Sequence, residues 1–176
     1  LNAIRTTSMY NPATDWLSKA RFGVMQHFLM NTEEEFDTRV DSFNVERFAK
    51  SLHDINAGYF VLTVGQNSGY YCTPNHAYDR ITGYAPGTKT SRRDLPMDMA
   101  EALAKYNIPL ILYSSCQGPM HDIRAYRAFG WKKQLESAQE AMQRWGEVVR
   151  EWSLRYGDAV KGWWIDGFYT PDQYTD

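Results

Sequence analysis

The stretch GWWIDGFY, residues 162–169, decides the fold because it has two interpretations. In the first, Asp166-Gly167 forms the tight turn of a β-hairpin, since both central positions of a type I′ turn need a positive φ. In the second, Trp163-Trp164-Ile165 completes a buried parallel strand that presents Asp166 at its carboxyl end, where α/β barrels keep their catalytic groups. The remainder of the chain has to distinguish between these two interpretations.

Strand-like and helix-like segments alternate along the chain. Four short apolar segments are typical of buried strands, at residues 21–28, 59–64, 108–115 and 160–166. Three amphipathic segments predict helices, at residues 44–57, 91–107 and 130–156. Strands that alternate with helices favour parallel βα units over a β-meander. We therefore predict that Asp166 ends a parallel strand and does not form a hairpin turn.

Polar residues mark the boundaries between these segments. Asn44 and Asp94 precede two of the predicted helices and are suited to cap them. The segment 65–90 is rich in Gly, Pro and Asn and predicts a long loop, and loops beyond about 12–15 residues in a compact domain are usually functional or disordered. The acidic run at 33–35 predicts a solvated loop or the start of a helix, and it could supply a second carboxylate.

Composition limits the classes of function. A chain of 176 residues fits one domain, and 43% hydrophobic residues suffice for a sizeable core. The formal net charge of −2 gives no electrostatic case for nucleic acid or an anionic membrane as a partner, and no apolar run approaches the length of a membrane span. Cys72 and Cys116 match neither a zinc spacing nor a disulfide framework.

The ends of the predicted strands carry polar side chains. They are His27, the pair Gln66-Asn67, the pair Tyr113-Ser114, and Asp166. A lone Asp166 would be a turn residue or a helix cap, and a lone His27 is more often a hydrogen-bonded structural residue. Because parallel strands end at the same edge of a sheet, the four groups together predict a ligand-binding site at that edge.

Metal and nucleotide cofactors are not predicted. The histidines at positions 27, 53, 76 and 121 show no paired spacing such as HExxH. No glycine-rich phosphate loop follows a strand. We therefore expect a site without a cofactor.

Five segments, in order along the chain, resemble the catalytic domain of the α-L-fucosidases of glycoside hydrolase family 29. They are WLSKARFGVMQHF (16–28), FNVERFAKSLHDINAGYFVLTV (43–64), SRRDL (91–95), IPLILYSS (108–115) and GWWIDG (162–167). The resemblance implies a (β/α)8 TIM barrel, of which the 176 residues hold about the first four βα units. It also implies hydrolysis of α-fucosides with retention, through a double displacement.

The resemblance also implies roles for individual residues. Asp166 matches the catalytic nucleophile. Substrate-binding positions are His27, Gln66, Asn67, Tyr113 and Trp164. A carbohydrate is then the expected partner, and members of the family suggest a secreted or periplasmic protein. Because four parallel strands leave two strand edges unpaired, residues 1–176 alone are expected to self-associate, and a homo-oligomer is possible.

Two departures from the family pattern keep alternatives open. Gln66-Asn67 replaces a His-His pair that grips the sugar, and amides hydrogen-bond to hydroxyls without carrying a charge. Retention also needs a second carboxyl group about 5–5.5 Å from the nucleophile, which in the family lies later in the barrel. The alternatives are a non-catalytic carbohydrate-binding relative and a glycosidase for a different sugar.

Overall fold

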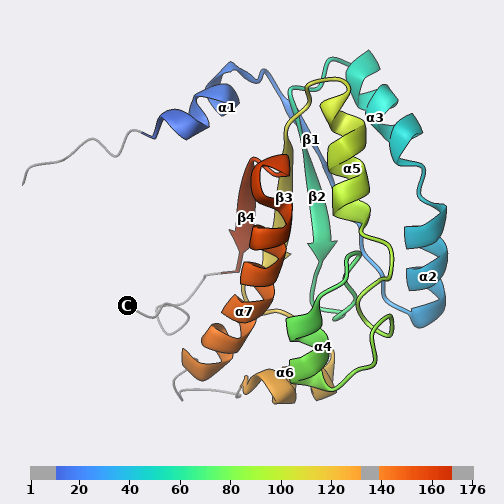
Figure 1. Ribbon diagram of the computed structural model, residues 1–176, viewed down its shortest axis with the longest axis vertical. Helices are drawn as coiled ribbons and strands as arrows, with labels where there is room; N and C mark the ends of the chain where they lie inside the picture. The colour runs from blue at the N-terminus through green and yellow to red at the C-terminus, as the bar shows by residue number, and fades with distance from the viewer. Residues whose placement is uncertain (1–10, 132–138, 168–176) are drawn as a thin grey trace, which may run out of the picture.

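The computed structural model describes residues 11–131 and 139–167, and it contains one parallel sheet (Figure 1). The strands are β1 (Gly23–Gln26), β2 (Tyr59–Gly65), β3 (Leu110–Ser115) and β4 (Gly162–Asp166). They pair in the order β1-β2-β3-β4, and every pairing is parallel. The predicted alternation of strands and helices is confirmed, and Asp166 is the last residue of a parallel strand.

Seven α-helices and two short 3-10 turns lie in the described ranges. The helices are α1 (Asp15–Lys19), α2 (Glu33–Ser42), α3 (Val45–Asp54), α4 (His76–Thr82), α5 (Leu95–Ala104), α6 (Ile123–Phe129) and α7 (Gln139–Tyr156). The 3-10 turns are η1 (Pro12–Thr14) and η2 (Gly157–Ala159). The three predicted helices correspond to α3, α5 and α7, while α2 starts within the acidic run. None of the described helices is long and apolar enough to cross a membrane.

The prediction of one uninterrupted loop over 65–90 was wrong, because α4 forms inside it. The Asn75 side chain accepts a hydrogen bond from the Tyr78 amide at 2.7 Å and so caps the start of the helix. Gly83 ends it with a positive φ of 69°, a conformation that glycine adopts without steric cost. The predicted caps Asn44 and Asp94 are confirmed, since their side chains accept from the Arg47 and Met97 amides.

The main core lies between the sheet and the helices on one of its faces (Figure 1). Alternate residues of the two inner strands point to this face and are almost completely buried, namely Phe60, Leu62, Val64, Leu110 and Leu112. Leu52 of α3, Leu103 of α5 and Trp152 of α7 belong to the same buried cluster. The near-continuous apolar character of the inner strands therefore reflects burial on both faces.

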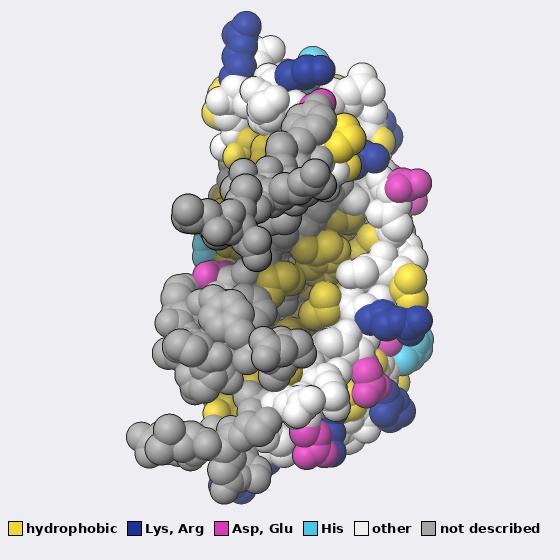
Figure 2. Space-filling model, turned by 90° about the vertical axis from the view of Figure 1, so that its left-hand side faces the viewer, with side chains coloured by type: hydrophobic (Ala, Val, Ile, Leu, Met, Phe, Trp, Pro, Cys, Tyr) yellow, Lys and Arg dark blue, Asp and Glu magenta, His cyan; other side chains and the backbone are white. Residues whose placement is uncertain are grey.

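The opposite face of the sheet carries Val61, Thr63, Tyr113, Trp164 and Asp166. On this face the inner strands are buried except for Tyr59 and Ile111, which are partly buried, whereas β1 and β4 are partly buried and Trp164 of β4 is exposed. Seen from the side of β4, hydrophobic side chains gather in a hollow of the molecule (Figure 2). The expected self-association of residues 1–176 stays a prediction.

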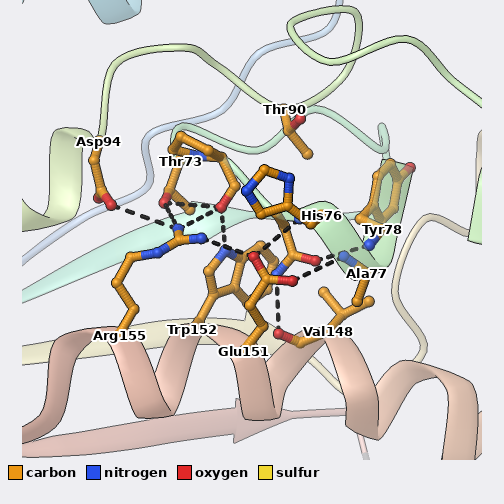
Figure 3. A network of polar contacts seen from close by, with 12 residues as sticks. Thr73, His76, Ala77, Tyr78, Thr90, Asp94, Val148, Glu151, Trp152 and Arg155 are labelled. Carbon is orange, nitrogen blue, oxygen red and sulfur yellow. Dashed lines mark hydrogen bonds and ion pairs between the residues drawn. The ribbon is translucent and has the colours of Figure 1, made fainter. Parts of the chain in front are cut away.

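A dense group of polar contacts fastens α7 to the segment that precedes α4 (Figure 3). We call Thr73, Asp94, Glu151 and Arg155 the α7 clamp. The Glu151 carboxylate accepts hydrogen bonds from the His76 and Ala77 amides at 2.9 and 2.8 Å, and from Arg155 at 2.7 Å. Arg155 also donates to the Thr73 hydroxyl at 3.2 Å and lies 3.5 Å from the Asp94 carboxylate. The clamp therefore joins the loops after β2 and before α5 to the last long helix.

Arg93, from the SRRDL segment, also joins separate elements through polar contacts, here among the helices α2 and α5. Its Nη1 donates to the backbone carbonyls of Val40 and Phe43 at 2.7 and 2.9 Å. Its Nε pairs with Asp98 of α5 at 2.7 Å. Arg93 thus links the end of α2 to α5, which explains an arginine at this place in structural terms.

Candidate functional site

A small cavity of about 140 Å³ opens at the carboxyl ends of β2, β3 and β4. It is lined by Gln66, Asn67, Tyr113, Ser115, Gln117, Met120, Asp166 and Gly167. Four of the predicted site residues thus meet in one place, although up to 100 residues separate them in the sequence. Parallel strands produce this convergence, because their carboxyl ends lie along the same edge of the sheet.

Three of these side chains form a chain of hydrogen bonds. Gln66 Nε2 donates to the Tyr113 hydroxyl at 2.8 Å, and that hydroxyl donates to Asp166 Oδ2 at 2.7 Å. We call Gln66, Tyr113 and Asp166 the site triad. Because the amide already donates to the phenolic oxygen, the hydroxyl proton is directed to the carboxylate. The triad therefore fixes the position of Oδ2 of the Asp166 carboxylate.

A β-bulge in β2 places Gln66 within reach of Tyr113. Thr63 pairs with Tyr113, but Gly65 pairs with Ser114, so β2 carries one extra residue between these positions. In a regular strand Asn67 would share the face of Thr63, and Gln66 would point to the helices. The bulge brings Gln66 to the face of Tyr113 instead. Gly65 is required here, since a Cβ would lie 2.4 Å from the Tyr70 carbonyl oxygen.

The two other predicted residues lie beside Tyr113. His27 follows β1 directly, and its ring centre is 5.5 Å from that of Tyr113. Trp164 meets Tyr113 edge-on with ring centres 5.8 Å apart, and it is 51% exposed. Neither lines the small cavity. The structure therefore gathers the other five predicted residues around Tyr113, with His27 and Trp164 at the margin.

Four residues of the cavity, among them Gly167 next to Asp166, were missed by the sequence analysis. Ser115 could have been found, because it lies two residues after Tyr113 on the same strand and hence on the same face. Gln117 and Met120 belong to the irregular segment between β3 and α6. Nothing in their spacing indicates a cavity, since loop side chains follow no period.

The chemistry of the cavity is that of a carboxylate. Asp166 is the one acidic side chain among the described residues that line it. Cys116 is adjacent, and its amide donates to the Asp166 carbonyl at 2.7 Å, but burial raises the pKa of its thiol to about 11. The thiol is thus protonated at neutral pH and a poor nucleophile. Within the described ranges, no group of three or more His, Cys, Asp or Glu side chains could hold a metal ion.

No protein-family model matches the sequence, and neither does any curated protein. Solved structures do match. An α-L-fucosidase of glycoside hydrolase family 29 from Bacteroides thetaiotaomicron, trapped as a covalent intermediate with 2-fluoro-fucosyl fluoride, superposes on 90% of the chain with a TM-score of 0.63 at 15% identity. α-L-Fucosidase isoenzyme 1 from Paenibacillus thiaminolyticus matches 90% with a TM-score of 0.64 at 16% identity.

The Thermotoga maritima α-fucosidase, in complex with a mechanism-based inhibitor, matches 76% of the chain with a TM-score of 0.51 at 13% identity. The chain spans 42%, 44% and 31% of the three solved chains respectively. At such identities the likeness concerns the fold. The described part of the chain therefore has the fold of the first βα units of the catalytic barrel of the family 29 α-L-fucosidases.

Proposed function

We propose that the chain contributes to a retaining glycoside hydrolase that removes terminal α-L-fucose from glycans, with Asp166 as its nucleophile. One observation carries this proposal: Asp166 ends β4 in a cavity, held by Tyr113, in a sheet that superposes on fucosidase barrels. One of these fucosidases was trapped as a covalent intermediate, which is the chemistry that a strand-end carboxylate performs in a retaining enzyme.

In the proposed first step, an oxygen of Asp166 attacks the anomeric carbon and forms a glycosyl ester. The bond to the leaving oxygen breaks, and a second carboxyl group protonates that oxygen. The same group then removes a proton from water, which attacks the ester and releases fucose with its configuration retained. In this scheme the Tyr113 hydroxyl orients the carboxylate through its hydrogen bond to Oδ2 at 2.7 Å.

The remaining residues of the site suit a small sugar. The amides of Gln66 and Asn67 both donate and accept, as vicinal hydroxyls require. Trp164 offers an exposed ring beside Tyr113, and an aromatic face packs well against the C–H groups of a pyranose. His27 lies on the other side of the Tyr113 ring and would contact the sugar from there.

The test is the replacement of Asp166 by glycine in the full-length protein, assayed with an aryl α-L-fucoside. We expect turnover to fall on the order of a thousandfold or more, as for other removed nucleophiles. Added azide should restore activity and give a fucosyl azide of inverted configuration, because it attacks from the face that the carboxylate has left. Asp158→Asn, in η2 before β4, is the matched control and should retain full activity. Unchanged turnover in Asp166→Gly would refute the assignment.

A second candidate is a carbohydrate-binding protein without hydrolytic activity. It is favoured by the neutral pair Gln66-Asn67 and by the single carboxylate among the described lining residues. Calorimetric titration with fucose, beside a turnover assay, separates the two candidates. Binding without turnover supports the second candidate. Turnover of another sugar in a panel of aryl glycosides would show a glycosidase with a different sugar specificity.

A further inference from the structure

The segment between β3 and α6 forms one wall of the small cavity. We call residues 115–121 the cavity turn, and its lining residues are Ser115, Gln117 and Met120. The Cys116 amide donates to the Asp166 carbonyl at 2.7 Å. The His121 amide donates to the Asn67 carbonyl, also at 2.7 Å. The cavity turn is therefore attached near both ends to segments that carry other lining residues.

A third attachment of the cavity turn comes from the core. Trp145 of α7 is 3% exposed, and its indole Nε1 donates to the Ser115 carbonyl at 3.1 Å. The ring also lies directly against the turn, because a Cβ placed on Gly118 would be 3.1 Å from the indole Cε3 atom. A buried indole N–H needs an acceptor, and here the acceptor is the backbone of a residue that lines the cavity.

The Trp145 indole is itself held by other buried rings. Its centre lies 5.5 Å from that of Phe129, 5.8 Å from that of Tyr71 and 6.1 Å from that of Trp152. All three of these neighbours are completely buried. Because a close-packed interior yields little, the indole is a firm support on which the cavity turn rests. The position of the turn is thus set by the core and not by the turn's own sequence alone.

Gln117 is the polar side chain that the cavity turn brings to the cavity with its hydrogen-bonding capacity unused. It is partly buried, and no residue in the described part of the chain hydrogen-bonds to its side-chain amide. Gln66, by contrast, already donates to the Tyr113 hydroxyl. An amide has two N–H donors and a carbonyl acceptor, which match a hydroxyl group that both donates and accepts. Gln117 is therefore suited to a hydroxylated ligand.

We propose that Gln117 binds a hydroxyl group of the sugar in this cavity, and that Trp145 is the positioning residue that holds Gln117 in place. The inference rests on the proposed function, because it assumes that fucose occupies the cavity. A turn that is fixed before the sugar arrives does not have to be ordered on binding, which lowers the cost of association. Since Gln117 contacts a hydroxyl and not the reacting atoms, it contributes to binding more than to the chemical step.

The first experiment measures fucose binding to the full-length protein by calorimetric titration. Gln117→Ala should weaken binding about fivefold, as for the loss of one neutral hydrogen bond. With an aryl α-L-fucoside it should raise KM by a similar factor and leave kcat within about twofold. Because the side chain is partly buried and has no partner among the described residues, the variant should fold normally. Unchanged fucose binding would overturn the role of Gln117.

The second experiment compares Trp145→Phe with Trp152→Phe. Trp152 lies two turns later on α7, and its Nε1 donates to the Pro74 carbonyl at 3.2 Å, outside the cavity. Both substitutions keep an aromatic ring and remove one indole donor, so the melting temperature should fall by comparable amounts. Only Trp145→Phe should weaken fucose binding, and adding it to Gln117→Ala should change binding by less than about twofold, because both act through one contact.

The outcomes separate this inference from the proposed function. Equal weakening of fucose binding by Trp145→Phe and Trp152→Phe would overturn the positioning role, and so would fully additive effects of Trp145→Phe and Gln117→Ala. Turnover that persists with fucose binding insensitive to Gln117 would overturn only the present inference. Fucose binding that depends on Gln117 without any turnover would overturn only the hydrolase, and the absence of both binding and turnover would overturn the two together.

Discussion

The α7 clamp and the site triad are both partly buried polar clusters, yet they are built on different principles. In the clamp, the Arg155 guanidinium lies against the Glu151 and Asp94 carboxylates, so that opposite charges meet inside one cluster. In the triad, a neutral hydroxyl holds the Asp166 carboxylate at the wall of a cavity. Charges that are balanced by neighbours fasten elements together, whereas a carboxylate that lines a cavity lies where a ligand would bind. This comparison predicts that each cluster can be damaged without harming the function of the other.

The largest effect is expected from Glu151→Ala, which removes the centre of the clamp. Two amides at the start of α4 and the Arg155 guanidinium lose their acceptor. Hydrogen bonds to a charged group contribute about 1.5–3 kcal/mol each. We expect the free energy of unfolding, measured by chemical denaturation, to fall by about 3 kcal/mol.

Glu147→Ala, one turn earlier on α7, is the control for this loss. Glu147 pairs with Arg80, and both side chains are more than half exposed, so its removal should cost less than about 0.5 kcal/mol. The activity per folded molecule should stay unchanged in both variants. A loss of activity in Glu151→Ala at temperatures where the variant is fully folded would contradict the separation of the two clusters.

Tyr113→Phe breaks the triad and leaves the clamp intact. It removes the donor to Asp166 and the acceptor of Gln66 while keeping the ring that contacts His27 and Trp164. We expect kcat with an aryl fucoside to fall about 10- to 100-fold, which corresponds to about 1.4–2.7 kcal/mol. The free energy of unfolding should change by less than about 1.5 kcal/mol. A large loss of stability with unchanged kcat would make Tyr113 a scaffold residue.

Gln66→Ala should act in the same direction and more weakly. The variant keeps the hydrogen bond from Tyr113 to Asp166 and loses only the outer member of the triad. A three- to tenfold decrease in kcat, about 0.7–1.4 kcal/mol, is the expected result. In the double variant with Tyr113→Phe, the two effects should combine to less than their sum, because Gln66 acts on the carboxylate through the hydroxyl in addition to its proposed contact with the sugar. Full additivity in that cycle would show that Gln66 contacts the sugar independently of Tyr113.

The smallest effect is expected at Asp79 of α4. Like Asp166 it accepts a hydrogen bond from a hydroxyl, but it lies outside the cavity. Thr90 donates to it at 2.9 Å, and burial raises the pKa of Asp79 above its ordinary value. A raised pKa means that the protonated form is favoured by folding, so this contribution to stability is present at acid pH and is lost as the pH rises through the folded pKa. Asp79→Asn should therefore be more stable than the wild type at pH 7, by less than about 1 kcal/mol, and equally stable near pH 3. Thermal unfolding at the two pH values measures this, and a penalty at pH 7 would show that ionised Asp79 is stabilising.

Much of the sheet could be predicted from the sequence, because a buried parallel strand leaves an unambiguous apolar run. The run before Asp166 and its entry from a helix were enough to place this carboxylate at a strand end. The short helices were harder. Both α4 and α6 have seven residues, too few for a clear period, although Asn75 and Asp122 at their starts are ordinary capping residues.

The site triad could not have been predicted, for a different reason. Gln66 reaches Tyr113 because of the register between β2 and β3. A bulge sets this register, and the bulge depends on how Tyr70 and Tyr71 pack against Gly65. Such contacts join residues that no local pattern relates. The sequence indicated which residues gather at the edge of the sheet, and the packing determined which of them touch.

The bulge in β2 also has a consequence for evolutionary comparison. In a relative whose strand is regular here, the residue that faces the tyrosine of the next strand comes one position earlier along the chain. An ungapped alignment would then equate Gln66 with a residue that occupies a different place in space. The residues of another protein that correspond to Gln66 and Asn67 should therefore be identified by superposing the structures. In the resulting alignment the gap belongs at Val64, the extra residue of the bulge.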